Sequence, residues 1–102
     1  MIGYQVTFYT SQDRRHHGEQ IGEWLLQLAH EMNFRGATVI AASEGIGQRH
    51  RIHSTHFFDL SDQPLCIVLA VTHEEGERLF ARLKDEKIEL FYIKAAVEFG
   101  VT

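Results

Sequence analysis

The segment from Gln48 to His56 concentrates the residues of this sequence that are best suited to hold an anion. It contains two arginines, three histidines and no acidic residue, so with neutral histidines it carries a charge of +2. The whole chain carries −4, which leaves −6 on the remainder. A basic segment on an acidic body is typical of an anion-binding site, and the guanidinium groups of Arg49 and Arg51 match phosphate oxygens well.

Two glycines, Gly45 and Gly47, stand just before this segment. Glycine lets backbone N–H groups turn toward a bound phosphate. The third glycine and following helix of a dinucleotide-binding fingerprint are missing from the sequence pattern. We therefore predict a phosphate site whose main contacts are Gly45, Gly47, Arg49 and Arg51. The alternative is a flexible surface loop whose glycines serve turns and whose charges aid solubility.

Histidines offer a second chemistry in the same segment. His50, His53 and His56 recur every three residues, and on a helical turn they would share one face and could bind a metal ion. The alternative is three exposed histidines on a mobile loop. We expect the other histidines, His16, His17, His30 and His73, to have ordinary structural roles. No serine, histidine and acid arrangement suggests a nucleophilic triad, so no enzymatic activity is predicted.

Length and composition limit the possible classes of protein. The chain has 102 residues, 44% hydrophobic and 24% charged, which is typical of a single globular domain spanning residues 1–102. Its acidic balance argues against nucleic-acid binding. The lone cysteine, Cys66, excludes an intrachain disulfide and is expected to be an inert core thiol. The longest apolar run, Leu65 to Val71, is too short to span a membrane, and with no signal-peptide pattern we expect a cytoplasmic protein.

Hydrophobic periodicity predicts strands over residues 4–10, 37–42, 65–71 and 88–97, and helices over 17–33 and 73–86. Asn33 is a plausible left-handed stop for the first helix, and Thr72 with Glu75 forms a capping box for the second. The strand 65–71 is apolar on both faces, which suits a central strand. Between the second and third strands, residues 43–64 show no clear periodicity, and such long loops are usually functional.

This order, strand-helix-strand twice over, predicts an α+β ferredoxin-like βαββαβ sandwich with both helices on one face of an antiparallel four-stranded sheet. The other face would carry apolar side chains from the first, third and fourth strands. Such a bare apolar face usually finds a partner, so we expect an oligomer.

The chain resembles a bacterial family of about 100 residues, a group of unknown function assigned to the PII-like superfamily, related to the nitrogen regulatory PII proteins. The resemblance covers essentially the whole chain and is densest over residues 35–61. It rests on the residues Arg35-Gly36-Ala37-Thr38-Val39, Gly45-Ile46-Gly47, His53, Phe57-Phe58 and Leu60-Ser61. The chain is a divergent member, because Ala41-Ala42 stands where the family often has Arg-Gly, and Leu69 where it usually has Glu.

The resemblance implies a homotrimer that binds an adenine nucleotide (AMP, ADP or ATP) in clefts between subunits. Residues 43–64 would be the signalling loop, which reports occupancy to a membrane transporter or an enzyme. The implied ligand contacts are Gly45, Gly47, Gln48, Arg49, Arg51 and His53. The expected function is thus a non-enzymatic sensor, with no nucleic-acid partner and no membrane insertion. The alternative is a divalent-metal-binding protein, like the metal-tolerance branch of the superfamily, that uses His50, His53 and His56.

Overall fold

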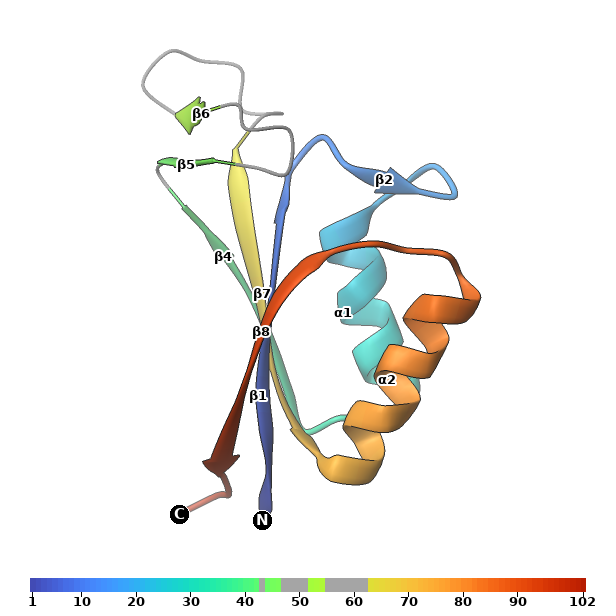
Figure 1. Ribbon diagram of the computed structural model, residues 1–102, viewed down its shortest axis with the longest axis vertical. Helices are drawn as coiled ribbons and strands as arrows, with labels where there is room; N and C mark the ends of the chain where they lie inside the picture. Colours follow the sequence, from blue (N-terminus) through green and yellow to red (C-terminus); the bar gives the residue numbers. More distant parts are fainter. Residues whose placement is uncertain (43, 47–51, 55–62) are drawn as a thin grey trace.

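The computed structural model describes residues 1–42, 44–46, 52–54 and 63–102, and it has two layers (Figure 1). An antiparallel sheet, in the order β4-β7-β1-β8, forms one layer, and helices α1 and α2 lie together on one of its faces. The predicted ferredoxin-like sandwich is therefore confirmed. The bounds of these elements are β1 Ile2–Ser11, α1 Ile21–Glu31, β4 Gly36–Ala41, β7 Pro64–Thr72, α2 His73–Asp85 and β8 Phe91–Glu98.

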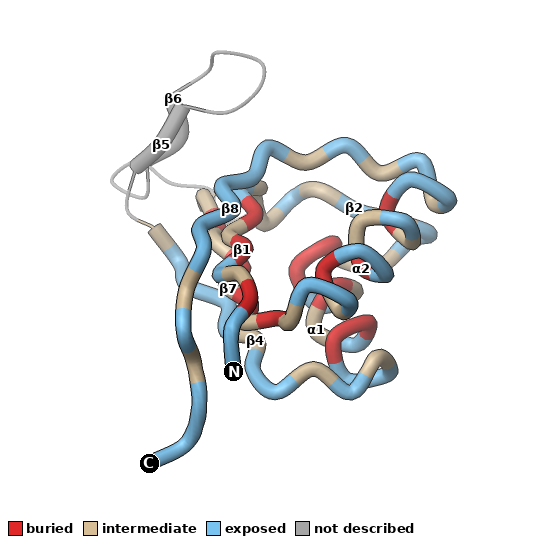
Figure 2. Tube along the Cα trace, turned by 60° about the horizontal axis from the view of Figure 1, so that its bottom comes forward, coloured by how far each residue is buried: buried red, intermediate tan, exposed pale blue. Residues whose placement is uncertain are grey.

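Alternation along the strands places the core between sheet and helices, where the buried segments of the chain face one another (Figure 2). On β1, Val6 and Phe8 are buried, while their neighbours Thr7 and Tyr9 are not. As predicted, β7 is a central strand, paired with β1 on one side and β4 on the other. Among the described residues neither helix is long and apolar enough to cross a lipid bilayer. The apolar residues that complete the core are Ile21, Leu25, Leu28, Leu65, Ile67, Leu69, Val71, Leu79 and Leu83.

The local signals at the helix ends are confirmed. The Thr72 hydroxyl accepts a hydrogen bond from the Glu75 backbone N–H at 3.2 Å, and the Glu75 carboxylate accepts one from the Thr72 N–H at 2.8 Å. These two bonds satisfy donors that the first turn of α2 leaves unpaired. Asn33 follows α1 with φ at 61°, the left-handed conformation that its short polar side chain tolerates.

Two predicted boundaries are wrong. The first helix begins at Ile21 rather than at residue 17, because residues 15–20 form a small hairpin of β2 (Arg15–His16) and β3 (Glu19–Gln20). His17 and Gly18 form its turn with φ values of 52° and 79°, which no right-handed helix contains. The last strand begins at Phe91, since residues 88–90 lie outside it, and Ile88 and Leu90 pack against the core instead.

The face of the sheet away from the helices is apolar, as predicted. Phe91 is 57% and Ile93 50% exposed, and Tyr9 and Ile40 are also exposed large apolar side chains of the sheet. The rings of Tyr9 and Phe91 pack against each other with centroids 5.5 Å apart. The prediction for Cys66 is wrong: it pairs with Tyr9 and Ile40 on this open face and is only half-buried. Strand alternation turns its neighbours Leu65 and Ile67, rather than the thiol, toward the helices.

Candidate functional site

The segment 43–64 leaves and re-enters the fold at one end of the sheet, where β4 and β7 lie side by side (Figure 1). The Ala42 N–H donates to the Pro64 carbonyl at 2.8 Å, which joins the start of the segment to its return. The Gln12 N–H donates to the Gln63 carbonyl at 2.9 Å, so the chain leaving β1 lies against the same place. These bonds fix the base of the segment on three neighbouring strands.

Within the segment, the structure describes a short hairpin of β5 (Glu44–Ile46) and β6 (Ile52–Ser54). Its register pairs Gly45 with His53, so two of the predicted ligand contacts come to lie opposite each other. This antiparallel pairing differs from the aperiodic loop that we predicted. Residues 52–54 are extended, so the helical turn that would place His50, His53 and His56 on one face does not apply at β6.

The other predicted site residues lie outside the described residues. They are Gly47, Gln48, Arg49, Arg51, His50 and His56, together with the aromatic pair Phe57 and Phe58. The phosphate site and the histidine metal site therefore stay predictions.

Polar groups from the end of β1 border the base of the segment. The hydroxyl oxygen of Thr10 is buried, and no hydrogen-bond partner for it lies within the described part of the chain. The Gln20 side chain donates to the Gln12 carbonyl at 3.4 Å and connects β3 to this end of the sheet. Burial lowers the pKa of Arg14, and the nearby Glu89 carboxylate opposes that shift. Arg14 is thus a half-buried cation between β1 and β2. Its position was not among the site residues that we predicted from the sequence.

A second constellation, formed by His16, His17 and Glu86, lies at the C-terminal end of α2. His16 Nε2 lies 3.0 Å and His17 Nε2 lies 3.4 Å from the same carboxylate oxygen, Glu86 Oε1. The other oxygen, Oε2, accepts a hydrogen bond of 3.0 Å from Arg82 Nε. Hydrogen bonds from His16 and then from Arg82 lower the pKa of Glu86 to about 2.

From the sequence alone we expect ordinary roles for these histidines and a helix that includes His17, and both expectations are wrong. Their partner is 70 residues away along the chain, so no local pattern pointed to it. A usable signal was present in His17-Gly18, because a two-residue hairpin turn needs residues that tolerate positive φ, and glycine and histidine are both enriched there.

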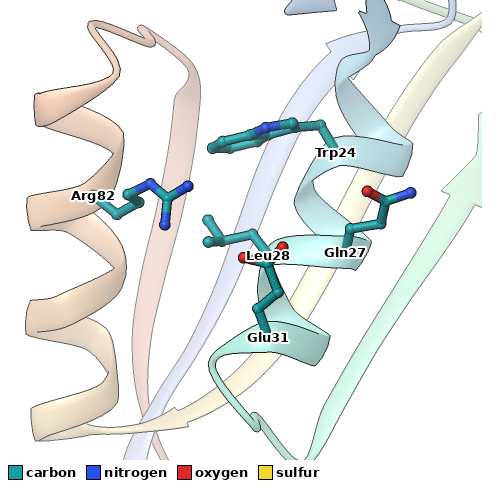
Figure 3. A pocket seen from close by; sticks show the side chains of 5 residues that line it. All are labelled: Trp24, Gln27, Leu28, Glu31 and Arg82. Carbon is teal, nitrogen blue, oxygen red and sulfur yellow. The ribbon is translucent and has the colours of Figure 1, made fainter.

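A shallow hollow between the two helices adjoins this constellation (Figure 3). Trp24, Gln27, Leu28 and Glu31 of α1 line it, together with Arg82 of α2. Figure 3 shows the Arg82 side chain directed from α2 toward Trp24 and Leu28, and its guanidinium carbon lies 5.9 Å from the centre of the Trp24 ring. Arg82 therefore links the hollow to Glu86, and a cation over an indole face is a stabilising contact.

The family model described as "Uncharacterized ACR, COG1993" matches residues 3–97, nearly the whole chain. This chain belongs to the DUF190 family. The resemblance inferred from the sequence is thereby confirmed. A search of the curated proteins finds no match to this DUF190 chain.

Solved structures show that this DUF190 chain has the fold of PII-like proteins. One of them is CPII, a nitrogen regulatory PII-like protein from Thiomonas intermedia K12, in a structure bound to ADP, AMP and bicarbonate. It matches with a TM-score of 0.71 and 15% sequence identity, over 99% of this chain and 91% of that chain. CPII bound to ADP and bicarbonate gives a TM-score of 0.71 and 16% identity, with the same coverage. A candidate PII-like signaling protein from Thermus thermophilus gives a TM-score of 0.64 and 15% identity, over 95% of this chain and 86% of that chain.

Proposed function

We propose that this protein is a single-domain, non-enzymatic PII-like sensor that binds an adenine nucleotide and signals through residues 43–64. The observation that carries the proposal is the position of this segment. It leaves one end of the sheet from a base held by backbone hydrogen bonds, and its hairpin sets Gly45 opposite His53. A segment fixed at its base can change its shape when a ligand binds without disturbing the core. CPII, which shares the fold, was solved with ADP and AMP.

The proposed sensor is a homotrimer with its nucleotide sites between subunits. The apolar open face of the sheet, with Phe91, Ile93, Tyr9 and Ile40 exposed, supports association because large apolar patches on a sheet are usually covered. A small two-layer sandwich has little room for a deep cleft of its own, which favours a site completed by a second subunit. The phosphates are bound by Gly45, Gly47, Gln48, Arg49, Arg51 and His53.

The partner that receives the signal is a membrane transporter or an enzyme that contacts residues 43–64. The chain is net negative, and residues 48–56 form its basic segment, so this segment is the part that attracts an acidic surface of a partner. A bound phosphate would neutralise the positive charge of the segment. Nucleotide binding therefore alters the charge of the signalling segment as well as its conformation.

The proposal is tested by isothermal titration calorimetry with AMP, ADP and ATP, using the wild-type chain and two arginine variants. Arg49→Ala removes charge-assisted hydrogen bonds of about 1.5–3 kcal/mol, so binding should weaken roughly 10- to 150-fold. Arg78→Ala, at an exposed position on α2, is the matched control and should bind as the wild type does. Rising salt should also weaken binding, because exposed charges are screened. Absence of heat with all three nucleotides at millimolar concentration would overturn the sensor proposal.

A further inference from the structure

We propose that His16, His17 and Glu86 form a binding site for a divalent transition-metal ion of the zinc class, separate from the nucleotide site. Three potential ligand atoms, one from each residue, lie within 4.8 Å of one another. Tetrahedral nitrogen and oxygen ligands about 2.1 Å from Zn²⁺ lie about 3.4 Å from one another. The observed separations of 3.0 Å and 3.4 Å from Glu86 Oε1 to the two Nε2 atoms are close to that value.

The surroundings hold two of the three ligands in place before any ion arrives. Arg82 Nε donates to Glu86 Oε2, which turns the other carboxylate oxygen toward the histidines and favours monodentate coordination. The His16 ring packs edge-on against the Trp24 ring, with centroids 4.8 Å apart. The side chains of His16 and Glu86 are 14% and 23% exposed. A site with oriented ligands loses little conformational freedom when it binds.

The backbone of the hairpin explains why both histidines reach one carboxylate. Successive side chains of a strand point to opposite faces, so His16 and His17 would diverge in a regular strand. His17 instead has φ at 52°, in the left-handed region that non-glycine residues seldom adopt, and its ring lies 4.1 Å from that of His16. Such conformations persist only where the surrounding structure holds them, and they are frequent at ligand-binding sites, where they pre-organise the ligating groups.

The position of Glu86 at the end of α2 also favours a cation beside its carboxylate. Glu86 is the C-cap residue of α2, and a carboxylate at a helix C-terminus opposes the helix dipole. Arg82 offsets part of that conflict through its hydrogen bond to Glu86 Oε2, and a divalent ion at Oε1 offsets it further. Metal binding thus joins the β2–β3 hairpin to the end of α2, across 70 residues of sequence.

The donor set determines the class of ion. Two imidazole nitrogens and one carboxylate oxygen suit Zn²⁺, Cu²⁺ or Ni²⁺, whereas Mg²⁺ and Ca²⁺ prefer oxygen ligands alone. His17 is 75% exposed, so the ion can enter from solvent and a water molecule can occupy the fourth position. When the ion binds through Nε2, the proton on that nitrogen exchanges through water to Nδ1, so each coordinated imidazole stays neutral with its single N–H on Nδ1.

The site is tested by titrating ZnCl₂, and CoCl₂ as a spectroscopic probe, into the full-length chain. We expect one ion per chain, the visible absorption of tetrahedral Co²⁺, and no binding of Mg²⁺ under the same conditions. His17→Gly should weaken Zn²⁺ binding at least tenfold while preserving the hairpin, since this side chain is exposed and glycine adopts the positive φ of this position. Glu86→Gln should do the same. His30→Ala removes an exposed histidine of α1 outside the cluster and is the matched control.

A triple variant, His50→Ala, His53→Ala and His56→Ala, separates this site from a metal site in the 43–64 segment. Under the present proposal it binds Zn²⁺ as the wild type does. Loss of binding in the triple variant, equal binding by His17→Gly and the wild type, or no binding of Zn²⁺ at all would each overturn the proposal. Calorimetry with adenine nucleotides is independent of these outcomes, so it tests the sensor proposal separately from the metal site.

Discussion

Replacing Ile93 should dissociate the proposed trimer, because this half-exposed side chain belongs to the open apolar face, on the edge strand β8. Ile93 pairs with Thr7 of β1, next to the exposed ring of Phe91. Complete burial of an isoleucine side chain contributes about 1.5–3 kcal/mol, and half of Ile93 is already covered within one chain. Covering the remainder therefore contributes about 1 kcal/mol per subunit.

Three subunits lose this contribution together, so Ile93→Ala should cost about 3 kcal/mol per trimer, roughly 150-fold in the assembly constant. Ile93→Lys adds a charge that must be desolvated and should leave only monomers at micromolar concentration. Neither change touches the buried core between sheet and helices, so far-UV circular dichroism should match the wild type. Val101→Ala, a change at an exposed position beyond β8, is the control and should assemble normally.

Sedimentation equilibrium over a range of concentrations measures these assembly constants. A wild-type chain that sediments as a monomer at micromolar concentration would refute the argument from the open face. Unchanged assembly of Ile93→Lys would show that the subunits associate through another surface. A stable wild-type dimer would refute the trimer.

Two further predictions concern stability. Thr72→Ala removes the acceptor for the Glu75 N–H, so the free energy of unfolding should fall by about 1 kcal/mol. The thermal midpoint should then fall by roughly 4–8 °C. Thr102→Ala, at the exposed end of the chain, is the control and should leave the midpoint unchanged. The folded-state pKa of Glu86, about 2, lies below its ordinary value of 4.5, so its contribution to stability is present above pH 4.5 and is lost as the pH falls toward about 2. In the presence of a chelator, the free energy of urea unfolding should therefore fall more for the wild type than for Glu86→Gln over this range, and parallel curves would contradict the assignment.

Local chemistry made much of the fold predictable from the sequence. Thr72 and Glu75 marked the start of α2, and Asn33 marked the end of α1, since capping and left-handed φ depend on residues only a few positions apart. The run Leu65 to Val71 indicated the central strand, because a run that is apolar on both faces suits a strand away from the edges of the sheet, and β7 pairs with β1 and β4. The densest family motifs, over residues 35–61, likewise pointed to the PII-like fold.

What the sequence could not provide were contacts that depend on register and on distant partners. The orientation of Cys66 depends on the pairing of β7 with β1, because a shift of one residue would exchange the two faces of the strand. The pairing of Gly45 with His53 depends on the β5–β6 register, which no hydrophobic alternation specified. His16 and His17 share the carboxylate of Glu86 only because a left-handed turn and the end of α2 meet in space. This contact between the hairpin and the end of α2 depends on the tertiary structure, because packing of the whole sandwich stabilises it and no residue near it in sequence does.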